Sequence, residues 1–170
     1  KAKLDAGRSL LYQTSRYVDI YKALDDIARE RKLTPEERQE QKKYAKLADA
    51  FTPLAKGMNS EYANQNAYDS IQIHGGSGFM LEYACQRIYR DARITSIYEG
   101  TTQLQTVAAI RYVTNGSYAA TLRDYELIPC SEEMQPLLDR VKEMTNKFEA
   151  CTNAVKESGN QDGFRSTSSL

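Results

Sequence analysis

The sequence predicts an all-α protein, an antiparallel four-helix bundle followed by a C-terminal helical extension. Three observations support this fold class. Apolar side chains recur every three or four residues over several long stretches, a period typical of amphipathic helices. A helix-capping signal is present at Thr34, and no segment alternates apolar and polar residues as a half-buried strand would. With 170 residues, the chain is long enough to bury a core.

Composition argues against several classes of function. The 23 basic and 23 acidic residues cancel, so no charge imbalance indicates binding to nucleic acid or to an anionic membrane. No apolar run reaches the roughly 18 residues needed to span a bilayer. Three cysteines, an odd number, and a single histidine argue against a disulfide framework and a zinc site. We therefore expect a cytoplasmic protein, or one of another reducing compartment.

The first long helix is expected at residues 3–29, where the apolar positions describe one helical face. The next helix has a clear start signal. Thr34 is suited to cap it, Pro35 fits its first position, and Glu37 completes a capping box.

The apolar pattern after this start continues to Ile71, but Pro53 lies inside it. Because proline lacks an amide hydrogen and crowds the preceding turn, we expect a kink or break at residues 49–53. Two shorter helices are expected at residues 83–93 and 102–114.

The last part of the chain is less regular. Gly116 is expected to end the helix before it, and a looser tyrosine-containing segment follows. Ser131 can then cap a final amphipathic helix. The predicted parts are a bundle domain at 1–116, a helical extension at 117–158 and a disordered tail at 159–170.

The first candidate functional segment is glycine-rich. Gly75, Gly76 and Gly78 follow directly where the helical pattern stops. Glycine backbones can approach a phosphate or a flat ring closely, but a helix end and turn explains this segment more simply. It fits neither a P-loop nor a dinucleotide-binding fingerprint. His74, the single histidine, is better explained as a helix-end residue that bonds to carbonyls than as a catalytic base.

An arginine–aspartate pair and a lone glutamate are further candidates for chemistry. Arg87 and Asp91 have the spacing of an ion pair on a helix surface, which explains them without a bound anion. Glu99 lies in a turn, after apolar residues and just before a helix. There it could simply stabilise the helix dipole, or, if apolar walls enclose it, accept a proton. The residues alone leave both explanations open.

Together these segments resemble the C-terminal helical domain of the acyl-CoA dehydrogenases. The resemblance covers roughly residues 1–116. The matching motifs are Gln72-Ile73-His74-Gly75-Gly76 with Gly78-Phe79, Glu82-Tyr83, Arg90-Asp91-Ala92-Arg93-Ile94 and Ile97-Tyr98-Glu99-Gly100-Thr101-Thr102-Gln103-Leu104-Gln105. Chance does not readily produce several separate motifs in this order.

The resemblance implies a flavoenzyme of fatty acid metabolism that oxidises an acyl-CoA thioester to its 2,3-enoyl product. Glu99 stands where the family's glutamate removes the α-proton while the β-hydrogen passes as hydride to the flavin of FAD. The backbone N–H of that glutamate and a ribityl hydroxyl of the flavin would stabilise the enolate. Tyr98 and Gly100 would line the thioester end of the pocket.

The resemblance also implies cofactor contacts and partners. Gln72, Gly75 and Gly76 correspond to a segment that touches the FAD of a neighbouring subunit. Thr101 and Gln103 correspond to residues that hold the FAD diphosphate or adenosine. A homodimer or homotetramer is implied, as is re-oxidation by an electron-transfer flavoprotein.

Two departures point to a larger subgroup of the family with C-terminal extensions. The connection at residues 29–43 is longer and more charged than in compact members, and residues 117–158 add helical material. The family's N-terminal helical domain and middle β-domain are missing, so we expect the C-terminal portion of a longer dehydrogenase, inactive by itself. Two alternatives stay open. One is a family relative with another reaction, an oxidase or desulfinase, and the other is a helical oligomerisation module without chemistry.

Overall fold

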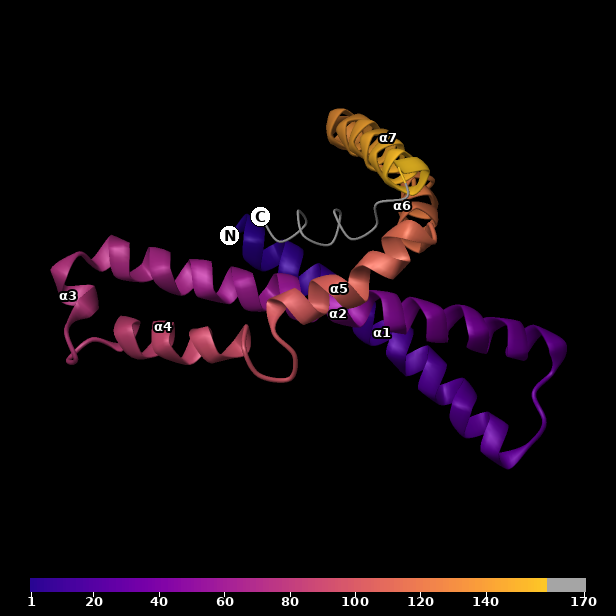
Figure 1. Cartoon of the computed structure of the whole chain (residues 1–170), viewed down its shortest axis with the longest axis horizontal. Coiled ribbons are helices and arrows are strands. Elements are labelled where there is room, and N and C mark those ends of the chain that lie inside the picture. The colour runs from indigo at the N-terminus through magenta and orange to yellow at the C-terminus, as the bar shows by residue number, and fades with distance from the viewer. Residues whose placement is uncertain (159–170) are drawn as a thin grey trace. The chain divides into compact units, whose positions relative to one another are not determined.

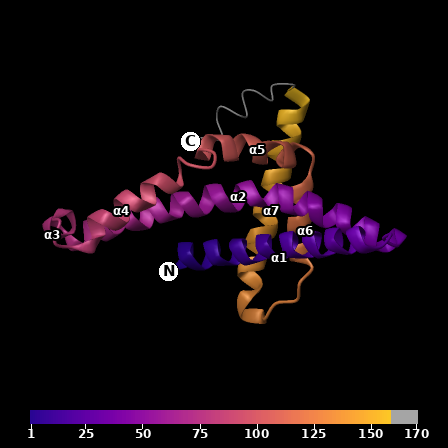
Figure 2. The same cartoon turned by 90° about the horizontal axis from the view of Figure 1, so that it is seen from below.

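The first two helices form a long antiparallel hairpin (Figures 1 and 2). In the computed structural model, which describes residues 1–158, helix α1 spans Ala2–Glu30 and helix α2 spans Pro35–His74. Thr34 caps α2 as predicted. Its hydroxyl oxygen accepts from the Glu37 amide at 3.2 Å, and the Glu37 carboxylate accepts from the Thr34 amide at 2.9 Å.

The same carboxylate closes the connection between the two helices. Arg31 donates two hydrogen bonds to Glu37, at 2.8 and 2.6 Å. These bonds, together with the Thr34 amide, lower the pKa of Glu37 from 4.5 to about 2. The start of α2 is therefore held by a backbone cap and an ion pair at once.

Aromatic and small residues fill the contact between α1 and α2. Tyr17 of α1 is buried, and its ring lies edge-on to Phe51 of α2 with 5.3 Å between ring centroids. Leu24, Ala50 and Ala55 are buried in the same hairpin. Small side chains in α2 allow the helices to approach closely, and their apolar burial is the main source of stability for the hairpin.

Of the kink or break predicted at Pro53, the break is wrong, because α2 continues through it without interruption. Proline removes only one backbone donor, the one that would bond the Asp49 carbonyl, so the rest of the hydrogen-bond ladder of α2 is kept. Pro53 itself is buried between Phe51 and Ala55. Burial of this part of α2 therefore outweighs the local cost of proline.

A second hairpin follows at the end of α2. The short helix α3 (Gly76–Phe79) reverses the chain, and α4 (Ala84–Thr95) runs back along α2. The rings of Tyr68 and Tyr89 meet edge-on at 6.4 Å, and the Ser70 hydroxyl lies 3.5 Å from the sulfur of the buried Cys85. Helix α5 (Thr102–Thr114) has the predicted bounds.

The chain divides into two compact units, residues 1–106 and the residues from 107 onward. In the second unit, α6 spans Ser117–Glu126, where a looser segment was expected. Gly116, at φ 81°, separates α5 from α6, so the predicted helix end is present but a new helix begins at once. The final helix starts differently from the prediction. Ser131 makes no side-chain cap; a 3₁₀ turn, Glu132–Met134, leads into α7, Gln135–Ser158.

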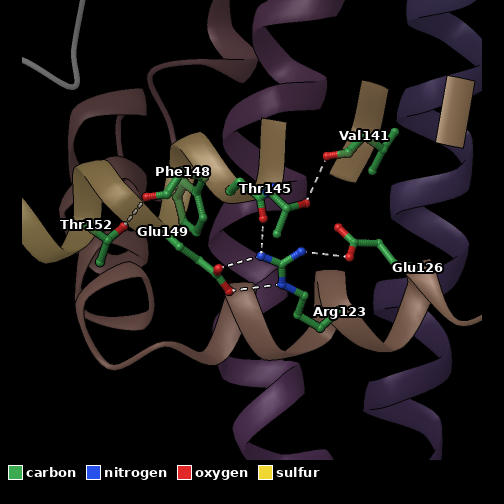
Figure 3. Close-up of polar contacts among 8 residues, drawn as sticks. Arg123, Glu126, Val141, Thr145, Phe148, Glu149 and Thr152 are labelled. Carbon is green, nitrogen blue, oxygen red and sulfur yellow. Dashed lines mark hydrogen bonds and ion pairs between the residues drawn. The ribbon is translucent and has the colours of Figure 1, made fainter. Parts of the chain in front are cut away.

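An arginine links α6 to α7 in this second unit (Figure 3). Arg123 donates to both carboxylate oxygens of Glu149, at 3.2 and 2.5 Å, and to Asn146 at 2.7 Å. It also bonds Glu126 on its own helix at 2.8 Å. These carboxylates, first Glu149 and then Glu126, raise the pKa of Arg123. Two-pronged bonding of this kind fixes orientation as well as distance.

The prediction of an all-α helical bundle is confirmed. Residues 1–158 contain seven α-helices, one 3₁₀ turn and no strand. Within that range no helix is long and apolar enough to cross a membrane, and all three cysteines are free thiols. The predicted disordered tail at 159–170 lies outside the described residues.

Candidate functional site

The turn between α4 and α5 has an unusual backbone. Glu99 has φ 52°, and it is the single non-glycine residue with positive φ among those the structure describes. Gly100 follows at φ 93°. The left-handed region costs an L-residue about 1–2 kcal/mol, so neighbouring contacts must hold the turn in place.

Side chains from two helices supply those contacts. The Lys56 ammonium of α2 donates to the Gly100 carbonyl at 2.5 Å. The Gln105 amide of α5 donates to the carbonyls of Glu99 and Gly100, at 3.2 and 3.4 Å. Two consecutive carbonyls of the turn are therefore satisfied by side chains and not by backbone.

The start of α5 is hydrogen-bonded to the same part of α2. The Thr102 hydroxyl donates to the Glu61 carboxylate at 2.5 Å, and the Thr102 amide bonds the Ser96 carbonyl at 3.2 Å. The Thr101 hydroxyl accepts from the Leu104 amide at 3.3 Å and so caps the helix. Hydrogen bonds therefore hold the turn at Gly100 and at the start of α5, directly after Glu99.

The turn also leaves several backbone donors without a partner. Among the described residues, no acceptor bonds the amides of Glu99, Gly100, Thr101 or Gln103. They lie at the N-terminal end of a 13-residue helix, where the helix dipole favours negative charge. This donor set fits an oxyanion or a phosphate group, as the implied FAD and thioester would require.

A cleft of about 260 Å³ lies beside the Glu99 side chain. It is lined by Lys56, Asn59, Ser60, Ala63, Thr95, Tyr98 and Glu99. The Glu99 side chain is exposed, so the described residues do not form the apolar walls that a buried base would need. A role of Glu99 as base requires apolar walls around its carboxylate, and the described residues alone do not supply them.

The glycine segment forms an open end of the hairpin. Gly75 has φ 59°, and no atom lies within 4 Å of the position that a side chain on Gly75 or Gly76 would take. Gln72 is exposed on the last turn of α2. His74 bonds the Ser70 carbonyl through Nδ1 at 2.8 Å, which confirms the interpretation of His74 as a helix-end residue.

The two groups of candidate residues are far apart on α2. Ala63 lines the cleft beside Glu99, whereas Gly75 follows the end of the helix. At 1.5 Å per residue, about 18 Å of helix separates these positions. Figure 1 shows α3 at the end of α2 and the α4–α5 connection beside its middle. The structure therefore does not bring the glycines to the Glu99 turn within one chain.

Two results differ from sequence reasoning. The ion pair expected between Arg87 and Asp91 is absent from the described residues, where both side chains are exposed. Lys56 was missed as a site residue. Its partner, Gly100, lies 44 positions away, so no local pattern could reveal the contact.

Comparison with known proteins gives the family. Residues 1–113 match the family model described as acyl-CoA dehydrogenase, C-terminal domain. Residues 114–165 match a second model, acyl-CoA dehydrogenase C terminal. No solved structure matches the chain significantly.

Curated relatives agree with these family models. The chain is 41% identical over 64 residues to an acyl-CoA dehydrogenase of Bacillus subtilis (strain 168), covering 38% of this chain and 17% of that protein. It is 35% identical over 105 residues to 3-methylmercaptopropionyl-CoA dehydrogenase of Ruegeria pomeroyi, covering 62% and 16%. It is 45% identical over 60 residues to caffeyl-CoA reductase-Etf complex subunit CarC of Acetobacterium woodii, covering 35% and 16%.

The matches therefore span less than a fifth of the length of these relatives. Within this chain, the first family model alone accounts for most of the residues, including the glycine segment and the Glu99 turn. The chain belongs to the acyl-CoA dehydrogenase family and corresponds to its C-terminal domain.

Proposed function

We propose that the chain is the C-terminal part of a longer FAD-dependent acyl-CoA dehydrogenase, and that Glu99 is its catalytic base. The observation that carries this proposal is the Glu99 turn. An exposed carboxylate sits on a left-handed backbone beside amide donors that lack partners. Strain of this kind is retained where function requires it.

Three residues of the turn would have separate roles in the reaction. Glu99 removes the α-proton of the acyl-CoA thioester, while the Glu99 amide donates to the thioester carbonyl and stabilises the developing enolate. Tyr98 and Gly100 line the thioester end of the site. The apolar walls that lift the proton affinity of the base come from outside the described residues.

FAD would be held by two separate surfaces. Thr101 and Gln103 offer polar groups at the start of α5 to the diphosphate or adenosine, supported by the unpaired Gln103 amide. Gln72, Gly75 and Gly76 offer an open segment at the other end of the hairpin, which suits the FAD of a neighbouring subunit. When bound, FAD accepts the β-hydrogen of the substrate with its electron pair.

The proposed homodimer or homotetramer is supported by the distance between these two surfaces, because one chain does not bring them together. It is also supported by large apolar side chains at the α3–α4 end, where Ile73, Phe79 and Leu81 are 84%, 78% and 83% exposed. An electron-transfer flavoprotein is the proposed electron acceptor, in line with the name of the Acetobacterium relative, a subunit of a reductase-Etf complex. The free cysteines suit a reducing compartment such as the cytoplasm.

The test uses the full-length protein and the variant Glu99→Gln, which keeps the size and polarity of the side chain. We expect a panel of acyl-CoA thioesters to bleach the flavin of the wild type. In the variant, turnover with an artificial electron acceptor should fall about 10²- to 10⁴-fold at equal flavin content. Undiminished turnover would remove Glu99 from its role, and a flavin that no thioester bleaches would exclude dehydrogenation.

A further inference from the structure

The strained turn is held by a cation that lies far from it in the sequence. Lys56 is half-buried on α2, and its ammonium bonds the Gly100 carbonyl at 2.5 Å. The same ammonium lies 5.9 Å from the centre of the Tyr98 ring. One side chain therefore contacts the residues on both sides of Glu99.

We propose that Lys56 is a positioning residue that holds the Gly100–Thr101 peptide beside Glu99 and so fixes the direction of the Thr101 amide. This inference rests on the proposed function of Glu99. It concerns a residue that touches the turn and not the reacting atoms.

The physical reason lies in the planarity of the peptide. In a trans peptide, the carbonyl of one residue and the amide of the next point in opposite directions. A bond from Lys56 to the Gly100 carbonyl therefore directs the Thr101 amide away from Lys56. By the same rule, the bond from Gln105 to the Glu99 carbonyl sets the direction of the Gly100 amide.

Lys56 is well suited to hold this geometry. It projects from the part of α2 that is packed against α1, next to the buried Ala55, so its backbone has little freedom. A hydrogen bond from an ammonium is roughly twice as strong as one between neutral groups. Gln105 reaches the same carbonyl at 3.4 Å, a longer and weaker contact. Lys56 is therefore the principal restraint on Gly100.

The bond also offsets the cost of the backbone. The positive φ angles of Glu99 and Gly100 are maintained by contacts with their carbonyls. Without Lys56, the Gly100 carbonyl keeps only the longer contact from Gln105, so the Gly100–Thr101 peptide is held less firmly and the Thr101 amide loses its fixed orientation toward the Glu99 carboxylate. Misplacement by about 1 Å is sufficient to lower a rate about 100-fold.

The experiment compares four variants of the full-length protein. Lys56→Met removes the donor and keeps the apolar stem, whereas Lys56→Arg keeps a cationic donor. Lys46→Met is the matched control, since Lys46 is an exposed lysine on the same helix. Glu99→Gln tests the proposed function in parallel.

The readout is the rate of anaerobic flavin reduction by an acyl-CoA, expressed per bound flavin, together with the Kd of the thioester. Lys56→Met is expected to lower the rate about 10- to 100-fold with less than a threefold change in Kd. Lys56→Arg should recover most of the rate, and Lys46→Met should match the wild type. Expressing the rate per bound flavin keeps the test valid where folding yield falls.

Three outcomes would overturn the inference. One is a wild-type rate per flavin in Lys56→Met while Glu99→Gln is inactive, which leaves the proposed function intact. Another is a Lys56→Arg variant as slow as Lys56→Met. The third is an equal loss in Lys46→Met. Full activity of Glu99→Gln would instead remove the proposed function itself.

Discussion

The backbone of Glu99 predicts an opposition between stability and activity. At φ 52°, glutamate occupies a region that Asn adopts more readily. Glu99→Asn should therefore stabilise the chain while it removes the proposed base. Glu99→Gln is the matched control, because glutamine has no greater tolerance of positive φ than glutamate.

The magnitude follows from the left-handed conformation. A strained L-residue costs about 1–2 kcal/mol, and asparagine recovers part of this, so we expect a gain of about 0.5–1 kcal/mol. No lost contact offsets the gain, because the exposed Glu99 side chain makes no hydrogen bond or ion pair within the described residues. For a chain of this size, 1 kcal/mol shifts Tm by about 2–4 °C.

The assay is urea unfolding of the 170-residue chain, followed by its helical circular dichroism. The midpoint should rise in Glu99→Asn and stay within error in Glu99→Gln, while both changes abolish activity in the full-length protein. A midpoint for Glu99→Asn at or below that of Glu99→Gln would refute the claim that the turn is strained.

Three further predictions use the same unfolding assay. Gly57→Ala should stabilise α2 by about 0.5–1 kcal/mol, because its methyl group would meet its nearest neighbour at an ordinary 3.5 Å. Gly78→Ala should destabilise the chain by about 1–3 kcal/mol, because the methyl group would lie 2.7 Å from the Ile71 carbonyl oxygen. Equal unfolding midpoints for the two glycine variants would contradict both predictions. The lowered pKa of Glu37, about 2 against 4.5, means that its bond to Arg31 stabilises the fold above pH 4.5 and is lost as pH falls toward 2. Glu37→Gln should flatten the acid side of the stability profile, and an unchanged slope would argue against it.

The sequence predicted helix boundaries well where the residues that set the boundary lie close together in the chain. The capping box at Thr34 and Glu37 marks the start of α2 because both partners lie within one turn. Helix α5 followed from its apolar pattern and from Gly116, whose φ of 81° no other residue type adopts so easily.

The errors came from features that tertiary contacts decide. Pro53 was expected to kink or break α2, but the residue is buried and the helix continues through it. Helix α6 was expected as a looser segment. Its Arg123 pairs with Glu149 on α7, 26 positions away, and the periodicity of a short segment cannot predict such a contact.

In the candidate site, too, some features follow from local sequence and others depend on tertiary contacts. Motif order led to the prediction of Glu99 and the glycine segment as site residues, and both lie within the residues that match the first family model. The left-handed φ of Glu99 and its restraint by Lys56 could not be predicted, since a glutamate between tyrosine and glycine carries no left-handed preference of its own. Only the folded chain brings α2 beside the turn.

The role of Glu99 as base is tested most directly by proton exchange, which requires no net oxidation. The full-length protein is incubated anaerobically in D₂O with an acyl-CoA analogue that cannot lose its β-hydrogen, and deuterium at the α-carbon is measured by mass spectrometry. We predict rapid incorporation with the wild type and a loss of at least about 100-fold with Glu99→Gln at equal flavin content. Incorporation at the wild-type rate in Glu99→Gln would contradict the assignment of Glu99 as the α-proton base.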